Sequence, residues 1–294
     1  MHAGRFAHFL AIDWSGAKGK RQKGIAMALA DARGGPPVLV PRGRGWSRED
    51  VLNVLRDDLP QETLVGIDLG IALPHADCGA FFPGSDISLP DAPALWSLID
   101  SICHDEPNLG ANHFVAHPDF EDYFRVGDRT GTHFRCDGAE HGRGRFRVTE
   151  HAQAAMGCKP YSNFNLVGAA QVGKSSLTGM RMLHRLRDHL PVWPIDPLPD
   201  SGSVIVEIYT SLAACEAGRS AGRAKMRSYE QLNHALVTIG SPPVDRRGPV
   251  DDHSSDALLS AAWLRHVAHD PARWTPADLT PAVAVTEGWT FGAV

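Results

Sequence analysis

Four apolar segments of this chain each carry or adjoin a carboxylate. FLAID ends in Asp13 and TLVGID ends in Asp68, while SVIVEIYTS contains Glu207. The segment DDHSSDALLSAAWLRH opens with Asp252 and Asp256. A carboxylate in or beside a buried strand loses hydration, which is costly unless a partner compensates for its charge. Several such carboxylates that converge on one point would repel one another unless a cation lay between them.

Hard divalent cations prefer oxygen ligands, so the acids predict a site for Mg²⁺ or Mn²⁺. We interpret them as a two-metal site that cleaves phosphodiester bonds. Asp252 and Asp256 are four residues apart and share one helical face, and the helix N-terminus adds a positive potential there. His253, next to them, is a candidate to contact a phosphate, to orient water, or simply to cap the helix.

The elements that must position these acids follow from the apolar pattern. Continuous apolar runs predict strands over residues 6–13, 24–31, 38–43, 63–74 and 203–211. Helical spacing predicts helices from Ser47 to Leu59 and over 93–104, 174–190, 228–239 and 252–268. The first three strands are expected to form an antiparallel meander, with the fourth and fifth beside the first in parallel.

The order of elements and four short motifs resemble the ribonuclease H-like superfamily. The motifs are IDWSGA, VGIDLGIALP, VIVEIYTS and DDHSSDALLSAA, and they look closest to a domain-of-unknown-function family described as predicted ribonuclease H-like nucleases. The resemblance implies one α/β domain over residues 1–294, with a mixed five-stranded sheet flanked by helices. Residues 75–165, where the pattern weakens, are expected to form an insertion or lid over the end of the fourth strand.

The same resemblance implies a role for each acid. Asp13, Asp68, Asp252 and Asp256 would be catalytic metal ligands, and Glu207 an additional catalytic acid. Asp13 would bridge two ions, with Asp68 and Asp256 each serving one. The activity implied is that of a nuclease, a metal-dependent hydrolase that acts on nucleic acid or nucleotide substrates.

A P-loop-like segment supports a different interpretation. Gly168 to Ser175, GAAQVGKS, fits the pattern GxxxxGK[ST], in which Lys174 would reach phosphates and Ser175 would bind Mg²⁺. The alternative function is therefore a nucleotide-binding ATPase. The preceding NFNLV is short and no typical second motif follows, so a helix-start turn that holds a substrate phosphate also fits. VGIDLGIA also resembles the phosphate loop of the actin, hexokinase and chaperone group, although that loop normally opens its domain.

Two further patterns point to ligands. Arginine and phenylalanine alternate over residues 125–147, which suits a single-stranded nucleic-acid groove, and we predict that Arg145 and Arg147 bind substrate with His253 and Lys174. A solvated lid, or a binding module without catalysis, fits the same tract. Histidines and cysteines in the middle of the chain suggest zinc only weakly, because none has the close paired spacing of a structural site: His104, His113, His117, His133, His141, His151, Cys103 and Cys136.

Composition limits the remaining classes. The 294 residues are 43% hydrophobic, which is enough to bury a full core, and the net charge of −5 lacks a global nucleic-acid-binding signature. Five dispersed cysteines argue against a disulfide scaffold. No signal peptide or membrane-length apolar run is evident, so we expect a cytoplasmic protein without membrane association. Oligomeric state is left open by the sequence.

Overall fold

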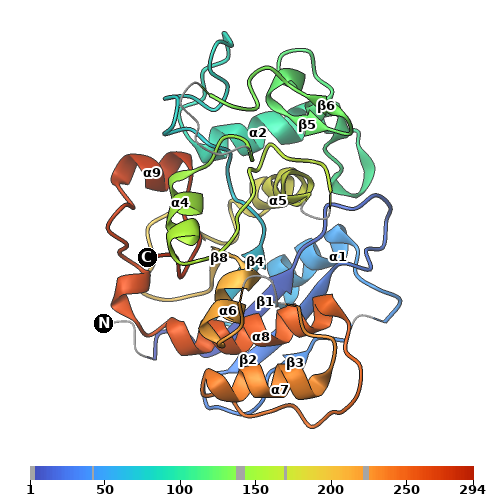
Figure 1. Cartoon of the computed structure of the whole chain (residues 1–294), viewed down its shortest axis with the longest axis vertical. Coiled ribbons are helices and arrows are strands. Elements are labelled where there is room, and N and C mark those ends of the chain that lie inside the picture. The colour runs from blue at the N-terminus through green and yellow to red at the C-terminus, as the bar shows by residue number, and fades with distance from the viewer. Residues whose placement is uncertain (1–3, 42, 137–142, 169–170, 221–224) are drawn as a thin grey trace.

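The computed structural model describes residues 4–41, 43–136, 143–168, 171–220 and 225–294. Its centre is a mixed sheet whose strands run in the order β3, β2, β1, β4, β8, β7 (Figure 1). Their bounds are β1 His8–Asp13, β2 Ala26–Asp31, β3 Val38–Leu39, β4 Thr63–Asp68, β7 Val192–Trp193 and β8 Val204–Ile208. A separate two-stranded ribbon consists of β5 Arg125–Val126 and β6 Arg129–Thr130.

The pairing of the predicted strands is confirmed, but their number is wrong. β2 pairs antiparallel with both β1 and β3, and β4 pairs in parallel with both β1 and β8. The sixth strand, β7, lies in the proline-rich segment PVWPIDPLPDSG, for which the sequence predicts no strand, and it pairs in parallel with β8. Two residues are too few to produce an apolar run, so the sequence pattern does not reveal this strand.

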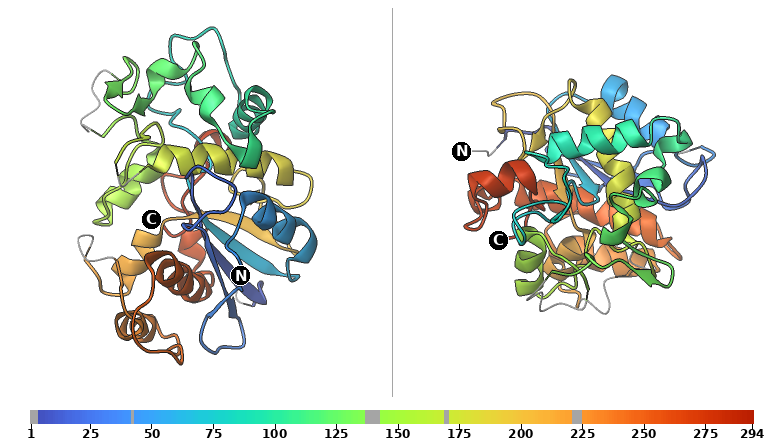
Figure 2. Two further views of the ribbon diagram at one scale, coloured as in Figure 1. Left: turned by 90° about the vertical axis from the view of Figure 1, so that its right-hand side faces the viewer. Right: turned by 90° about the horizontal axis from the view of Figure 1, so that it is seen from above.

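Alternation along the strands divides the interior into two cores, because successive strand side chains point to opposite faces. Phe9, Ala11 and Val206 belong to the core on one face, with the C-terminal helices. Leu10, Ile12 and Ile205 belong to the core on the other. Figure 2 shows α7 and α8 on one side of the sheet and α1 with α5 on the other.

The helices are α1 Arg48–Asn53, α2 Ala92–Ile102, α3 Asn112–Val115, α4 Val148–Ala155, α5 Val172–Leu186, α6 Thr210–Glu216, α7 Tyr229–Thr238, α8 Asp252–Val267 and α9 Pro281–Thr286. A π-helical turn, Val54–Asp58, continues α1. Single 3-10 turns span Pro107–Leu109, Glu121–Tyr123 and Pro271–Arg273. None of these described helices is both long and apolar enough to cross a membrane.

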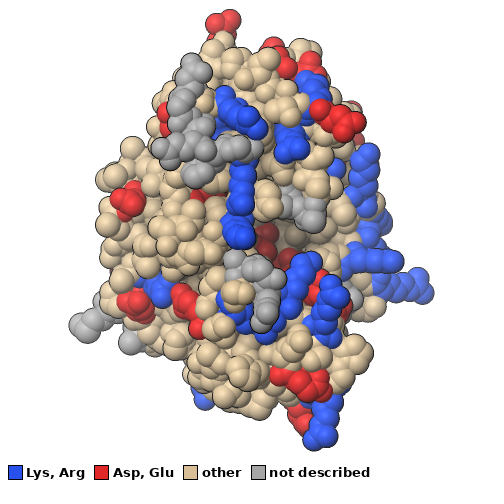
Figure 3. Space-filling view, in the orientation of Figure 1, with Lys and Arg blue, Asp and Glu red and all other residues tan. Residues whose placement is uncertain are grey.

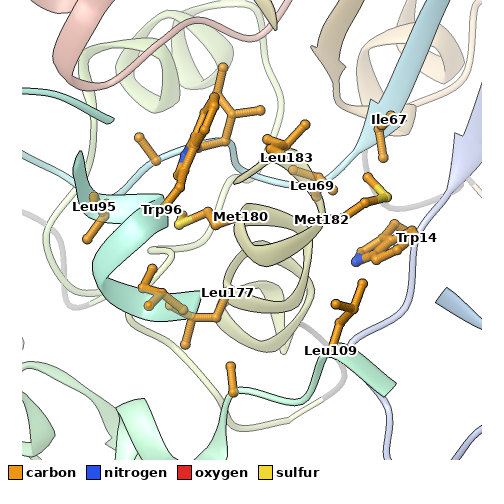
Figure 4. Packing of buried hydrophobic residues seen from close by; sticks show 14 of the residues in the cluster. Trp14, Ile67, Leu69, Leu95, Trp96, Leu109, Leu177, Met180, Met182 and Leu183 are labelled. Atoms are coloured by element: carbon orange, nitrogen blue, oxygen red, sulfur yellow. The ribbon is translucent and has the colours of Figure 1, made fainter. Parts of the chain in front are cut away.

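The helix α5 connects the sheet to the segment that the sequence predicts to be a lid. Met180 and Leu183 of α5 lie among Trp96 of α2 and Leu69, just after β4 (Figure 4). The Trp96 indole also donates to the carbonyl of Ile71 at 2.6 Å. Strand β4 ends at Asp68, earlier than predicted. The residues that follow leave the sheet and pack in the core that also holds Leu10, Ile12 and Ile205. Residues 75–165 hold α2, α3, α4 and the ribbon, and α2 and the ribbon lie beyond α5 from the sheet in Figure 1.

Candidate functional site

Asp13 and Asp68 lie side by side at the carboxyl ends of two neighbouring strands. They are partners in the parallel register of β1 and β4, so their backbones lie one strand spacing, about 4.8 Å, from each other. Asp13 follows Ala11 and Asp68 follows Gly66 at the strand period of two, so both side chains belong to the face that α8 covers. Two acids therefore point into the same space at one edge of the sheet.

The helix α8 brings Asp256 and His253 to the same place. Asp251 caps its first turn by accepting from the Ser254 backbone amide at 2.9 Å. The helix lies close to β4 because Gly66 has no side chain: a Cβ there would lie 2.7 Å from Leu264 Cδ1. Leu264 is two helical turns after Asp256, so this close contact sets how near the acidic end of the helix comes to the strands.

Burial and the charges of neighbouring acids raise the pKa values of the three carboxylates. Burial raises the pKa of Asp68 well above its usual value, and the charges of Asp13 and Asp256 raise it further. Burial and the charges of Asp13 and Asp252 raise the pKa of Asp256 to about 7. Burial also raises the pKa of Asp13, although a hydrogen bond with His253 opposes that effect. Burial is the largest cause of the raised pKa at each of the three carboxylates, and nearby negative charges add to it.

Two neighbours compensate for part of this charge. His253 Nδ1 lies 2.6 Å from Asp13 Oδ2, and this contact raises the pKa of the imidazole. Thr210, the first residue of α6, donates its hydroxyl to Asp68 Oδ2 at 3.1 Å. Within the described part of the chain, no lysine or arginine forms an ion pair with Asp68 or Asp256. A cation from solution is the group that would complete the balance.

Asp68 and His253, the partner of Asp13, border a cavity of about 380 Å³. Asp68 at the end of β4 and His253 of α8 line it, together with Trp14, Tyr209 and Lys174. In Figure 3, acidic side chains lie inside a hollow near the middle of the face, with lysine and arginine side chains flanking it. Acids next to basic groups in one hollow suit a ligand that carries phosphate and binds with a metal ion.

The N-terminal turn of α5 forms the wall opposite the acids. Gly16 packs directly on it, since a Cβ at Gly16 would lie 2.3 Å from the backbone carbon of Lys174. The Trp14 indole donates to Thr178 Oγ1 at 3.1 Å, and Ser176 Oγ accepts from the Gly70 amide at 3.1 Å. These contacts fix the end of α5 against the loops that follow β1 and β4, and they place Lys174 on the cavity.

The P-loop-like segment is explained largely by this packing. Gly173 is required because a Cβ there would lie 2.5 Å from the carbonyl oxygen of Asn163. The preceding residues 161–168 form no strand, only an isolated bridge between Asn165 and Arg125. Ala169 and Ala170, in the middle of the motif, lie outside the described residues. The described part therefore lacks the strand that precedes a nucleotide-binding P-loop.

Glu207 does not join the other acids, because it points to the opposite face of the sheet. Its neighbour in register is Ile67, not Asp68, so its side chain enters the core that holds Ile205. There it accepts from Arg147 at 2.6 and 2.8 Å and from the backbone amide of Ile71 at 2.8 Å. Its carboxylate oxygens are thus engaged in linking β8 to the segments around it.

Arg147 is the centre of a buried ionic cluster. Its guanidinium also contacts Glu150 at 2.6 Å and the carbonyl of Glu287 at 3.0 Å, and its side chain is 1% exposed. Glu287 in turn accepts from the amides of His75, Ala76 and Val148. Arg147, Glu150 and Glu207 line the cavity, but the arginine is held by two carboxylates that already neutralise it.

The rest of the arginine- and phenylalanine-rich tract is not an open groove. The Arg145 side chain is fully buried and pairs with Asp77 at 2.6 Å, with backbone carbonyls of Pro74, Ala80 and Phe81 as further acceptors. Phe124, Phe134 and Phe146 are buried as well, so no base can stack on them. The predicted substrate contact of Arg145 conflicts with this burial, since the side chain stabilises the loop that follows β4.

Asp252 lies at the rim of the site. Its carboxylate contacts Lys225 Nζ at 2.9 Å, in an ion pair whose lysine is 71% exposed. An exposed pair of this kind contributes little to stability. Asp252 influences the site through its charge, which contributes to the raised pKa of Asp256.

The three central acids are more widely spaced than the ligands of a single ion. Among the described residues, only Asp77, Cys78 and Cys136 bring three candidate ligand atoms within 4.8 Å of one another. That cluster suits a cation poorly, because Asp77 is already paired with Arg145 and burial raises the pKa of Cys78 to about 11. Asp13, Asp68 and Asp256 offer the oxygen ligands that Mg²⁺ and Mn²⁺ prefer, although their ligand atoms do not all lie within 4.8 Å of one another.

Sequence reasoning missed Thr210 and Tyr209. Both follow β8 directly, at the sheet edge where parallel strands end, so a hydroxyl just beyond a buried parallel strand was the available signal. The roles of Trp14 and Gly16 depend on contacts with α5, about 160 residues later in the chain, and no local pattern indicates them.

No family model, no curated protein and no solved structure matches this chain.

Removing one of the crowded charges is expected to stabilise the protein. The folded-state pKa of Asp256, about 7, lies above its usual 3.8, so the ionised carboxylate destabilises the fold progressively as the pH rises between those values. In chelator, Asp256→Asn should exceed the wild type in free energy of unfolding by about 1–2 kcal/mol at about pH 8 and by much less at about pH 4. Urea denaturation at both pH values measures this difference, with exposed Asp278→Asn as the control. An equal difference at both pH values would contradict the charge-crowding explanation.

Removing Arg147 is expected to have the opposite effect. Arg147→Met leaves Glu150 and Glu207 buried without a cation, which should lower the free energy of unfolding by about 3–5 kcal/mol. Arg33→Met, which removes an arginine that is 90% exposed in its pair with Asp31, should leave the free energy of unfolding nearly unchanged. Thermal and urea melting compare the two variants. Equal changes in the free energy of unfolding would show that the buried cluster contributes no more to stability than the exposed ion pair.

Proposed function

We propose that this protein is a ribonuclease H-like hydrolase that cleaves phosphodiester bonds in nucleic acid or nucleotide substrates with Mg²⁺ or Mn²⁺. The observation that carries the proposal is the placement of Asp13 and Asp68 in register on adjacent parallel strands, with Asp256 facing them from α8. Burial is the main cause of their raised pKa values and neighbouring negative charges add to it, so a divalent ion would favour the ionised forms.

Each residue at the site has a role that suits this chemistry. Asp13, Asp68 and Asp256 would hold the metal, which when bound lowers the pKa of a water and neutralises charge on phosphate oxygens. Lys174 lies on the opposite wall, where its ammonium group would contact a non-bridging phosphate oxygen. Hydrolysis forms one phosphorus–oxygen bond from water and breaks the bond to the leaving oxygen.

His253 is the candidate proton carrier. Its Nδ1 contacts Asp13 and its ring lines the cavity, so Nε2 is the nitrogen that would serve a substrate oxygen. The carboxylate of Asp13 orients the ring, as an acid commonly does for a catalytic imidazole. Metal binding at Asp13 and protonation of His253 would compete, because both neutralise the same carboxylate.

The ATPase alternative has less support. Lys174 and Ser175 line the cavity, but the strand that should precede them is replaced by a turn in residues 161–168. The same lysine explains phosphate binding equally well in a hydrolase.

Cleavage assays with a single-stranded oligonucleotide test the proposal. Asp68→Asn and Asp13→Asn should each lower kcat/KM by about 100-fold or more, since a metal ligand supports several kcal/mol of transition-state stabilisation. The exposed control Asp278→Asn should match the wild type. Cleavage that persists in chelator, or that survives both substitutions, would rule out this site as the catalytic centre.

A further inference from the structure

A second cavity of about 520 Å³ lies next to the first. The two share Gly16, Ala17 and Lys174 in their linings, so the contact between Gly16 and the start of α5 forms a ridge between them. Whatever Lys174 binds therefore has a cavity on each side. One cavity is lined by Asp68 and His253, and the other by Pro107 and Asn108 of the 3-10 turn Pro107–Leu109.

The second cavity is suited to a mostly uncharged group. Its walls include the aliphatic side chains of Val115, Val126, Leu166 and Leu177. The carboxylate of Glu106, also in the lining, accepts from Asn112 Nδ2 at 2.7 Å and from the backbone amide of His113. Apolar walls with a few polar groups are typical of pockets that bind organic ligands. Lys18, exposed at the edge, adds a second cation beyond Lys174.

The wall of this cavity is rigidly built. Arg48 is buried and donates to the carbonyls of Ser15 at 2.9 Å, Ala17 at 2.6 Å and Asn108 at 2.6 Å, and so joins the ridge to the 3-10 turn. Asn108 and Leu109 both have positive φ values, 57° and 53°, which are uncommon for residues other than glycine. Backbone held in such a conformation is often part of a ligand site.

We propose that the second cavity binds the nucleoside on one side of the scissile phosphate, while the first cavity holds the phosphate and the group on its other side. This inference rests on the proposed function and narrows its substrate class. A phosphodiester has two organic substituents and would fill both cavities, whereas a phosphomonoester would leave the second empty. The preferred substrate is thus a strand or dinucleotide with a nucleoside on each side of the phosphate.

The test uses substitutions that narrow the second cavity and leave Asp13, Asp68 and Asp256 unchanged. Ala116 is exposed and lines only this cavity of the two, so Ala116→Leu and Ala116→Trp should obstruct it in a graded way. Ala277→Trp, an exposed alanine in the C-terminal part, is the matched control. Two diesters are compared: a dinucleoside monophosphate, and a nucleoside monophosphate methyl ester that has a nucleoside on one side only.

Ala116→Trp should lower kcat/KM for the dinucleoside by about tenfold and leave that for the methyl ester within about twofold. Ala116→Leu should lower kcat/KM for the dinucleoside by an intermediate factor, and Ala277→Trp should leave it unchanged. Melting curves should confirm that each variant folds. If both diesters are cleaved and Ala116→Trp affects them equally, the second cavity is not the nucleoside site, although the proposed function stands.

If the wild type cleaves neither these diesters nor the single-stranded oligonucleotide, the proposed function fails, and binding decides the inference. Fluorescence titration with a labelled dinucleoside monophosphate in chelator should then show weaker binding to Ala116→Trp than to Ala277→Trp. Equal binding by the two variants would overturn the inference.

Discussion

The in-register pairing of β1 with β4 is the constraint on which the rest of this structure depends. It places Asp13 beside Asp68 on the same face of the sheet, where burial and mutual repulsion oppose their ionisation. Gly66 then lets α8 approach closely enough to bring Asp256 to the pair. A fold that only needed stability would not gather three acids in this way, so the arrangement points to a ligand that carries positive charge.

A second group of buried acids shows how the same chain treats charge that has only a structural role. Glu150 and Glu207 share the guanidinium of Arg147, and backbone amides and a threonine hydroxyl satisfy the remaining oxygens. Glu207 points to the opposite face of the sheet from Asp13 and Asp68, although its cluster lines the same cavity as Asp68. The cluster links β8 to α4 and the C-terminal segment. Both groups are buried, and the pKa of Glu150 is raised to about 7 as that of Asp256 is. The difference between them is the ion pairs, because Arg147 pairs with Glu150 and Glu207.

Much of this organisation could be predicted from the sequence, because it depends on local patterns. The apolar runs that end at Asp13 and Asp68 identified β1 and β4, and the acid spacing before Ala257 identified the start of α8. The face to which Glu207 points was not predicted, since it depends on a one-residue difference in register between β4 and β8. The burial of Arg145 and the phenylalanines was also missed, because an alternating basic and aromatic tract looks the same in a groove and in a core.

The most direct test of the central claim is a crystal structure of the protein soaked in Mn²⁺, with anomalous scattering used to locate the ions. The account predicts Mn²⁺ at about 2.0–2.3 Å from carboxylate oxygens of Asp13, Asp68 and Asp256, with the three side chains drawn closer together than they are without metal. Anomalous density confined to Asp77, Cys78 and Cys136, or none within reach of Asp13 and Asp68, would contradict it.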